Sequence, residues 1–231
     1  MRILAVDTSS NVASVAIVDD AKLVCECVLN NKLTHSQTLM PMIDEVFKKS
    51  ELNPSDIDVF AVAEGPGSFT GLRIGVTTIK GLAHAAEKPV CGVNTLEALA
   101  YNLPFCPHII APIMDARREQ VYNAFYKWED GVLKEIAAPR AISLEDCMKE
   151  LMELGEKVVF LGDGVAVFRE KIKDTLKEQA LFAPQLACGQ RAACVAEAAK
   201  NKETINYGEL APVYLRKSQA EREREEREAA K

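Results

Sequence analysis

The chain has 231 residues, 48% of them hydrophobic, which is enough to bury a substantial core. Its formal net charge is −6 and no basic stripe runs along it. This disfavours nucleic-acid binding by the chain alone, because phosphate neutralisation supplies most non-specific affinity. No segment reaches the roughly 18 apolar residues of a membrane span, and Asp7 comes too early for a secretory signal. Seven scattered cysteines without a C-x-x-C pair indicate free thiols in a reducing cytosol, so we expect a cytoplasmic protein.

The first half of the chain predicts a three-strand meander followed by helix, strand, helix and strand. Runs rich in β-branched residues, with Asp19 and Asp20 at a turn, indicate the meander. Apolar residues at helical spacing mark the helices, and Pro41 must lie near the first turn of its helix or kink it. The expected strands cover residues 3–7, 12–18, 23–29, 58–63 and 90–93, and the expected helices about residues 39–49 and 71–86.

The same order returns after residues 103–107, a predicted crossover. Asp130-Gly131 indicates a turn, and Ser143 with Asp146 resembles a helix capping box. The expected strands cover residues 109–114, 120–128, 132–136 and 158–161, and the expected helices residues 143–154, 165–177 and 190–200. Both halves therefore read βββ-α-β-α. By analogy this is an α/β protein with the duplicated ribonuclease-H-like fold of actin, sugar kinases and Hsp70 (ASKHA), with two mixed-sheet subdomains, 1–105 and 106–231.

Residues 64–73, Glu-Gly-Pro-Gly-Ser-Phe-Thr-Gly-Leu-Arg, form the most informative segment. A glycine-rich loop that enters a helix directs backbone N–H groups towards a positive helix end, where an anion can bind. The segment lacks the Gly-Lys-Ser/Thr end of a Walker A loop and is not a G-x-G-x-x-G fingerprint. A tight structural turn and a loop for a ligand or partner both fit this pattern.

Other polar segments are weaker candidates for a site. Asp7, Thr8 and Ser9 occupy the position at which kinases of this architecture bind phosphate, but no glycine or basic residue follows nearby, so a nucleotide contact here is a weak prediction. Residues 115–119, Asp-Ala-Arg-Arg-Glu, combine acids with bases, although a surface hairpin accounts for them equally well. Residues 162–164, Gly-Asp-Gly, fit either an adenosine loop or a strand-to-helix turn. The histidines His35, His84 and His108 lack metal-binding spacing.

Five segments distributed over nearly the whole chain carry a family resemblance: residues 5–10, 35–37, 61–99, 115–122 and 212–216. In this order they resemble the TsaB (YeaZ-like) family of bacterial tRNA threonylcarbamoyladenosine (t6A37) biosynthesis. The resemblance implies a non-catalytic subunit required for N6-threonylcarbamoylation of adenosine 37 in tRNAs that read codons beginning with A. It implies binding to the catalytic subunit TsaD, recruitment of the ATPase TsaE, a homodimer when alone, and tRNA contact only through the complex.

The resemblance also implies what the chain lacks. The related TsaD carries a metal-binding pair of histidines at i and i+4, and the matching positions here are Thr95 and Leu99. We therefore expect no metal site, no catalytic residue and no resident cofactor, while ATP or ADP at the interface of the complex is left open. An autonomous ATP-dependent kinase and a metalloprotease are the alternatives. The first lacks a complete phosphate-binding set, and the second lacks the histidines.

The helix over residues 71–86 has two apolar stripes, of which a sheet can bury only one. One stripe runs from Leu72 to Ala83, and the other contains Ile74 and Thr78. Together with the helix that precedes it, this helix is expected to bind a second chain, although burial of both stripes within one chain is the alternative. The predicted partner interface consists of Leu39, Met42, Ile43, Val46, Arg73, Ile74, Thr77, Thr78, Lys80 and Gly81. The charged tail, residues 218–231, is expected to be a solvated helix or a disordered arm.

Overall fold

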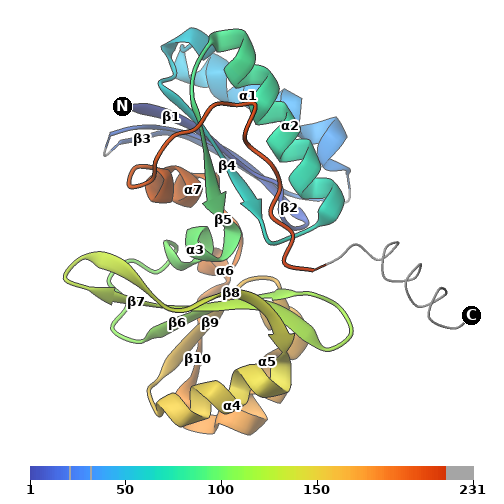
Figure 1. Ribbon diagram of the computed structural model, residues 1–231, viewed down its shortest axis with the longest axis vertical. Coiled ribbons are helices and arrows are strands. Elements are labelled where there is room, and N and C mark those ends of the chain that lie inside the picture. Colours follow the sequence, from blue (N-terminus) through green and yellow to red (C-terminus); the bar gives the residue numbers. More distant parts are fainter. Residues whose placement is uncertain (21, 32, 217–231) are drawn as a thin grey trace, which may run out of the picture.

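A computed structural model describes residues 1–20, 22–31 and 33–216 (Figure 1). The charged tail at 218–231, with its expected solvated or disordered character, lies outside these described residues. None of the described helices is both long and apolar enough to cross a membrane.

The N-terminal half contains a five-stranded mixed sheet in the order β3-β2-β1-β4-β5. Strands β1, β2 and β3 form the expected antiparallel meander, and β4 and β5 add in parallel. Helix α1 begins at His35, one turn before the first residue of its apolar stripe, and Pro41 lies within it. The elements are β1 (Arg2–Asp7), β2 (Val12–Asp19), β3 (Lys22–Asn30), α1 (His35–Ser50), a 3-10 turn (Pro54–Asp56), β4 (Val59–Gly65), α2 (Phe69–Ala86) and β5 (Val90–Asn94).

The C-terminal half repeats this topology in the order β10-β9-β6-β7-β8. The duplication predicted from the sequence is confirmed, and strand β10, which was not predicted, completes the second sheet. Helix α3 (Thr95–Ala100), also not predicted, links the halves. The elements are β6 (Ile109–Asp115), β7 (Gln120–Glu129), β8 (Val132–Ser143), α4 (Leu144–Leu154), β9 (Val158–Leu161), α5 (Gly164–Leu176), a 3-10 turn (Lys177–Gln179), β10 (Ala180–Phe182), α6 (Gln185–Cys188) and α7 (Ala192–Ala199).

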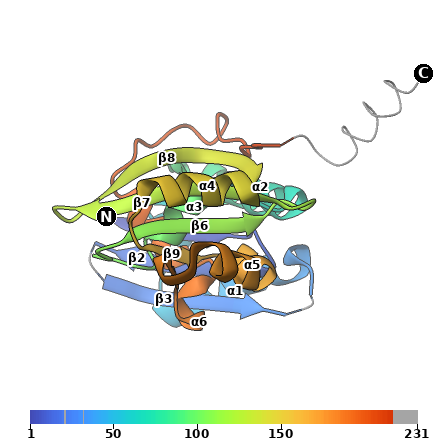
Figure 2. The same ribbon diagram turned by 90° about the horizontal axis from the view of Figure 1, so that it is seen from below.

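Each sheet is buried on both faces, which explains the nearly continuous apolar runs of β1, β4 and β6. Helices α1 and α2 cover one face of the first sheet, and α7 covers the other. Helices α4 and α5 cover the outer face of the second sheet, whereas its inner face packs against α3 at the junction of the halves. The two sheets and their helices therefore form stacked layers, seen from two directions in Figures 1 and 2.

The predicted extent of the C-terminal subdomain, residues 106–231, needs a correction, because the last part of the chain returns to the N-terminal half. Helix α7 packs on β1 and β2, and Arg191 just before it pairs with Glu26 of β3. The backbone of Ile205 then bridges to Val90, and Leu210 is buried in the core under α1 and α2. We call residues 201–216 the C-terminal strap, and its last part runs along α2 in Figure 1. The C-terminal subdomain thus ends near residue 189.

Candidate functional site

A cleft of about 1220 Å³ opens between the two halves. The β1–β2 turn and the glycine-rich loop form its N-terminal wall, and the β6–β7 loop and the start of α5 form the opposite wall. The end of the strap closes one side. Its lining includes Ser9, Ser10, Asn11, Gly67, Ser68, Phe69, Asp115, Arg117, Tyr122, Asp163, Arg169, Phe182, Gln190, Tyr214 and Arg216. The fold therefore brings together four segments that the sequence marked separately: residues 7–10, 64–73, 115–119 and 162–164.

The three nucleotide candidates, Asp7, Thr8 and Ser9, are all buried and engaged within the chain. Ser9 donates to Asp7 Oδ1 from its backbone N–H at 2.8 Å and from its hydroxyl at 2.6 Å. Thr8 donates to the carbonyl of Gly71 at 2.8 Å. Burial raises the pKa of Asp7 to about 6, although the bonds from Ser9 and the nearby His35 act against that rise. Among the three, only Ser9 lines the cleft.

The glycines of the 64–73 loop allow it to pack directly on neighbouring backbone. A side chain at Gly65, where φ is +136°, would meet the carbonyl oxygen of Val213 at 2.2 Å. One at Gly67 would meet the carbonyl of Ser9 at 2.4 Å, and one at Gly71 would meet that of Thr8 at 2.1 Å. Ser68 caps α2 by accepting a bond from the N–H of Gly71. Structural packing thus accounts for each of these glycines, and anion binding by the loop stays a prediction.

The opposite wall contains acids in two environments. Burial raises the pKa of Asp163, whose Oδ1 accepts a bond of 3.4 Å from the N–H of Asp115. Asp115 in turn forms an ion pair of 3.5 Å with Arg117. In the loop that follows, Arg117, Arg118 and Glu119 all adopt left-handed backbone conformations, with φ between +54° and +65°. Such conformations are uncommon outside glycine and cluster at functional sites.

Arginines from four distant segments gather around this cleft. Arg117, Arg169 and Arg216 line it, Arg118 follows Arg117 in the same loop, and Arg73 reaches it through contact with Tyr214. We call Arg73, Arg117, Arg118, Arg169 and Arg216 the arginine rim. Arg216 donates to the carbonyl of Ala116, which ties the strap to the β6–β7 loop. The sequence held no signal for this group beyond the adjacent pair at 117 and 118, because the other three are separated by dozens of residues.

A second hollow, of about 550 Å³, lies between α1 and α2. Its lining is His35, Ser36, Leu39, Met40, Phe69, Thr70, Arg73, Ile74, Thr77 and Thr78, and we call it the helix groove. At one end the guanidinium of Arg73 lies 3.9 Å from the centroid of the Phe69 ring, and Phe69 stacks on Tyr214 at 4.6 Å. His35 at the start of α1 contacts the carbonyl of Ser10 at 2.7 Å. The groove and the cleft therefore share Phe69 as a common wall.

The structure corrects part of the predicted partner interface. Leu39, Met42, Ile43 and Val46 face the first sheet, with exposed fractions of 5% or less, because they form the apolar stripe that holds α1 on the core. Among the predicted set, Arg73, Ile74, Thr77 and Thr78 line the groove, and Leu39 lines its floor with only 1% of its surface exposed.

The last two predicted interface residues lie beyond the groove on α2. Lys80 donates to the carbonyls of Gly208 and Leu210 in the strap at 3.3 and 2.9 Å. Gly81 is exposed, with no atom within 4 Å of where a Cβ would stand.

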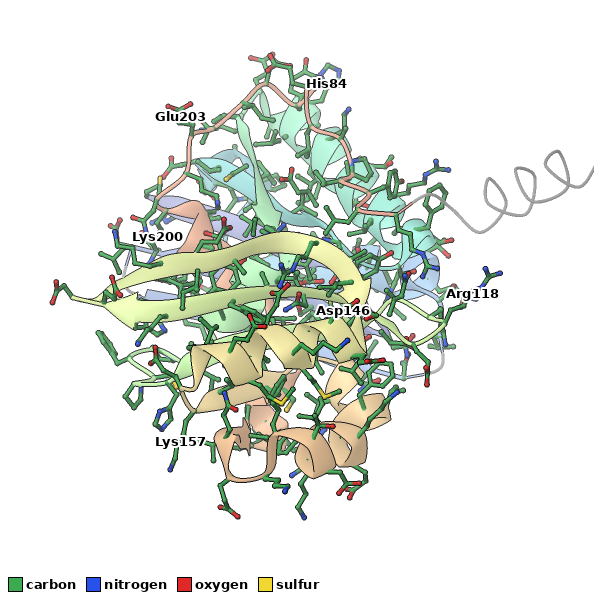
Figure 3. All side chains as sticks on the ribbon, turned by 60° about the horizontal axis from the view of Figure 1, so that its bottom comes forward. His84, Arg118, Asp146, Lys157, Lys200 and Glu203 are labelled. Carbon is green, nitrogen blue, oxygen red and sulfur yellow. The ribbon has the colours of Figure 1, made fainter. Side chains whose placement is uncertain are left out.

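The positions that match the histidine pair of TsaD are also buried. Thr95 and Leu99 lie one turn apart on α3, with exposed fractions of 0% and 1%. Among the residues that the structure describes, no group of three or more His, Cys, Asp or Glu side chains could hold a metal ion. His84 lies near the end of α2 (Figure 3), where its ring contacts that of Tyr207.

Two repeated βββ-α-β-α halves around a central cleft define a protein of the ASKHA class. Residues 24–224 match the family model described as TsaD: tRNA N6-adenosine threonylcarbamoyltransferase. The chain is 34% identical to the tRNA threonylcarbamoyladenosine biosynthesis protein TsaB of Bacillus subtilis, over 96% of each chain. It is 31% identical to the protein of that name from Escherichia coli, over 95% of this chain and 96% of that one.

A solved crystal structure is similar to this chain over nearly its whole length. It is that of an uncharacterized Pseudomonas aeruginosa protein described as similar to peptidase YeaZ. It superposes with a TM-score of 0.78 at 26% identity, covering 93% of this chain and 99% of that one. The chain belongs to the TsaB (YeaZ-like) family, within the wider group that the TsaD model describes.

Proposed function

We propose that the chain is a non-catalytic subunit required for N6-threonylcarbamoylation of adenosine 37 in tRNAs that read codons beginning with A. In this role it binds and stabilises a catalytic TsaD partner in the cytoplasm and helps to recruit the ATPase TsaE. The relatives named TsaB support the pathway, because they match almost the whole chain and carry that biosynthesis in their names. The stretches of the chain that resemble the family support the partner role.

The observation that carries the proposal is the helix groove. Two neighbouring helices have their sheet-facing stripes buried, yet they still present Met40, Ile74, Thr77 and Thr78 around a shared hollow. Met40 is 50% exposed and lines this hollow together with Ile74, so the two helices present neighbouring apolar side chains to a partner. A helix pair from TsaD, or from a second copy when TsaD is absent, fits such a face by ridge-into-groove packing.

The chemistry of the cleft supports a role without catalysis. Asp7, Thr8 and Ser9 are bonded to their own chain, and the positions of the TsaD histidines hold a threonine and a leucine in the core. We propose that the chain needs no cofactor of its own, and that any ATP or ADP is bound at the interface of the complex. By the same proposal, tRNA reaches the chain only through that complex.

Reconstituted tRNA threonylcarbamoylation tests the proposal. TsaD and TsaE from the same organism would be supplied with the threonylcarbamoyl-adenylate donor and tRNA, with or without this chain. We expect modification only when the chain is present, and ATP turnover by the chain alone at background level. Full modification without the chain would overturn the proposal, as would robust ATP hydrolysis by the isolated chain.

A further inference from the structure

We infer that the arginine rim, together with Tyr214, is a contact surface for single-stranded RNA. This inference rests on the proposed function, which brings tRNA to the complex, and it locates the contact on this chain. The RNA would bind across the mouth of the cleft.

Charge is the first argument. The chain as a whole is acidic, with a formal net charge of −6, yet three arginines line one opening, Arg118 follows Arg117 in the same loop, and Arg73 contacts Tyr214 at its edge. Two acids of the loop are paired within the chain, the half-buried Asp115 with Arg117 at 3.5 Å and the exposed Glu119 with Lys171 at 3.3 Å. Arginine is suited to phosphate because its planar fork can donate two parallel hydrogen bonds. The positive charge of the rim would therefore attract a polyanion that approaches this chain.

The aromatic groups within the rim are the second argument. Tyr214 stacks on Phe69 on one side and remains 40% exposed, and Arg73 lies against both rings. Across the cleft, Arg169 lies 4.2 Å from the centroid of the Phe182 ring. Aromatic and guanidinium planes beside a positive groove are the features that bind unstacked bases and their backbone. Duplex RNA would instead need a surface that spans two grooves.

Backbone geometry is the third argument. Arg117 and Arg118 both have left-handed backbone conformations, and Figure 3 shows Arg118 at the outer edge of the molecule. The loop is fastened at its base, where Arg216 donates to Ala116 and Arg117. It therefore presents two adjacent cations on a supported backbone at the lip of the cleft, as a ligand-binding loop requires.

The test uses the assembled complex and tRNA. The variant Arg117→Asn/Arg118→Asn removes two charges while asparagine tolerates the left-handed backbone. The matched control, Lys134→Asn/Lys157→Asn, removes two exposed charges from the other end of the same half, where Figure 3 places Lys157. Fluorescence anisotropy would measure the affinity of each complex for tRNA between low and moderate salt. We expect the rim variant alone to bind more weakly, with a salt slope lower by about 0.7 to 0.9 for each phosphate that it no longer neutralises.

The remaining arms separate this inference from its alternatives. A competition with inorganic phosphate shows whether the site prefers RNA to a free anion, and millimolar phosphate should displace little tRNA. Unchanged tRNA affinity and salt slope in the rim variant would overturn the inference even if the complex modifies tRNA normally. Loss of TsaE from the purified complex with unchanged tRNA binding would make the rim a protein contact instead. Failure of the wild-type chain to support modification would count against the proposed function, not the rim.

Discussion

The backbone N–H of Val213 donates a hydrogen bond of 2.7 Å to the carbonyl oxygen of Glu64. This bond fastens the C-terminal strap to the end of β4, immediately before the glycine-rich loop. The carbonyl of Val213 then occupies the space beside Gly65 in which any other residue would place its Cβ. The strap, the loop and the start of α2 are thus one packed unit, and this unit forms a wall of both the cleft and the helix groove.

Gly65→Ala should therefore destabilise the fold by at least about 2 kcal/mol, because alanine adds both a strained φ and a clash with the Val213 carbonyl. Gly81→Ala is the matched control. Its site lies inside α2 with open space around it, so the same change should stabilise the protein by about 0.5–1 kcal/mol. Urea unfolding followed by circular dichroism would measure both. Equal effects of the two substitutions would contradict this account of the loop.

The buried carboxyl of Asp7 predicts a pH-dependent stability. Its pKa is raised from 3.8 to about 6 by burial, so the protonated form is favoured in the folded state. The resulting stabilisation is complete below pH 4 and is lost as the pH rises through about 6. Asp7→Asn, which keeps an acceptor for Ser9, should remove this dependence and raise stability at pH 7.5 by up to about 3 kcal/mol.

The measurement is the free energy of unfolding of both proteins at several values between pH 4 and 8. The difference between them isolates Asp7 from the other titrating groups. Asp174→Asn, at an exposed position on α5, serves as the control and should follow the wild type. Parallel curves for wild type and Asp7→Asn would show that the Asp7 carboxyl does not titrate in this window.

The return of α7 to the N-terminal half predicts a stabilising role for Glu26. Its carboxylate pairs with Arg191 and accepts a bond of 3.1 Å from the N–H of Ala193, at the start of α7. Glu26→Gln should lower the free energy of unfolding by about 1–3 kcal/mol, since it weakens charge-assisted bonds at a nearly buried site. Glu178→Gln, at an exposed glutamate, should have little effect. An unchanged midpoint for Glu26→Gln would indicate that this contact does not hold α7.

The sequence predicted the repeated order of strands and helices because both halves bury strands on two faces and helices on one. It could not predict β10, whose three residues give no period, nor the return of α7, because an alanine-rich helix fits either sheet equally well. Periodicity identified two apolar stripes on α2 but not which side of α1 faces the sheet. Consequently Met42, Ile43 and Val46 were predicted at a surface that they do not reach, and Leu39 reaches the groove only at its floor. The arginine rim could not be predicted either, because its residues come from distant segments that only the fold brings together.

The helix groove gives the last prediction. Ile74 and Thr78 lie partly buried on its α2 side, so a glutamate there would be left unpaired when a partner helix covers it. Ile74→Glu or Thr78→Glu should cost a few kcal/mol of association, on the order of a hundredfold in affinity, while the chain stays folded. Met152 lies on the exposed face of α4 at the other end of the molecule, so Met152→Glu should change neither the association affinity nor the folding of the chain.

The variant Leu39→Glu tests whether the inner face of α1 belongs to the core or to the interface. A charge beneath α1 should unfold the N-terminal half, whereas a charge at the interface should only weaken assembly. Sedimentation of the chain alone and with TsaD would measure association, and circular dichroism would report folding. A folded Ile74→Glu variant that still self-associates and binds TsaD with wild-type affinity would exclude the groove as the interface. A folded, dissociated Leu39→Glu variant would instead place α1's inner face at the interface, against its burial in the core.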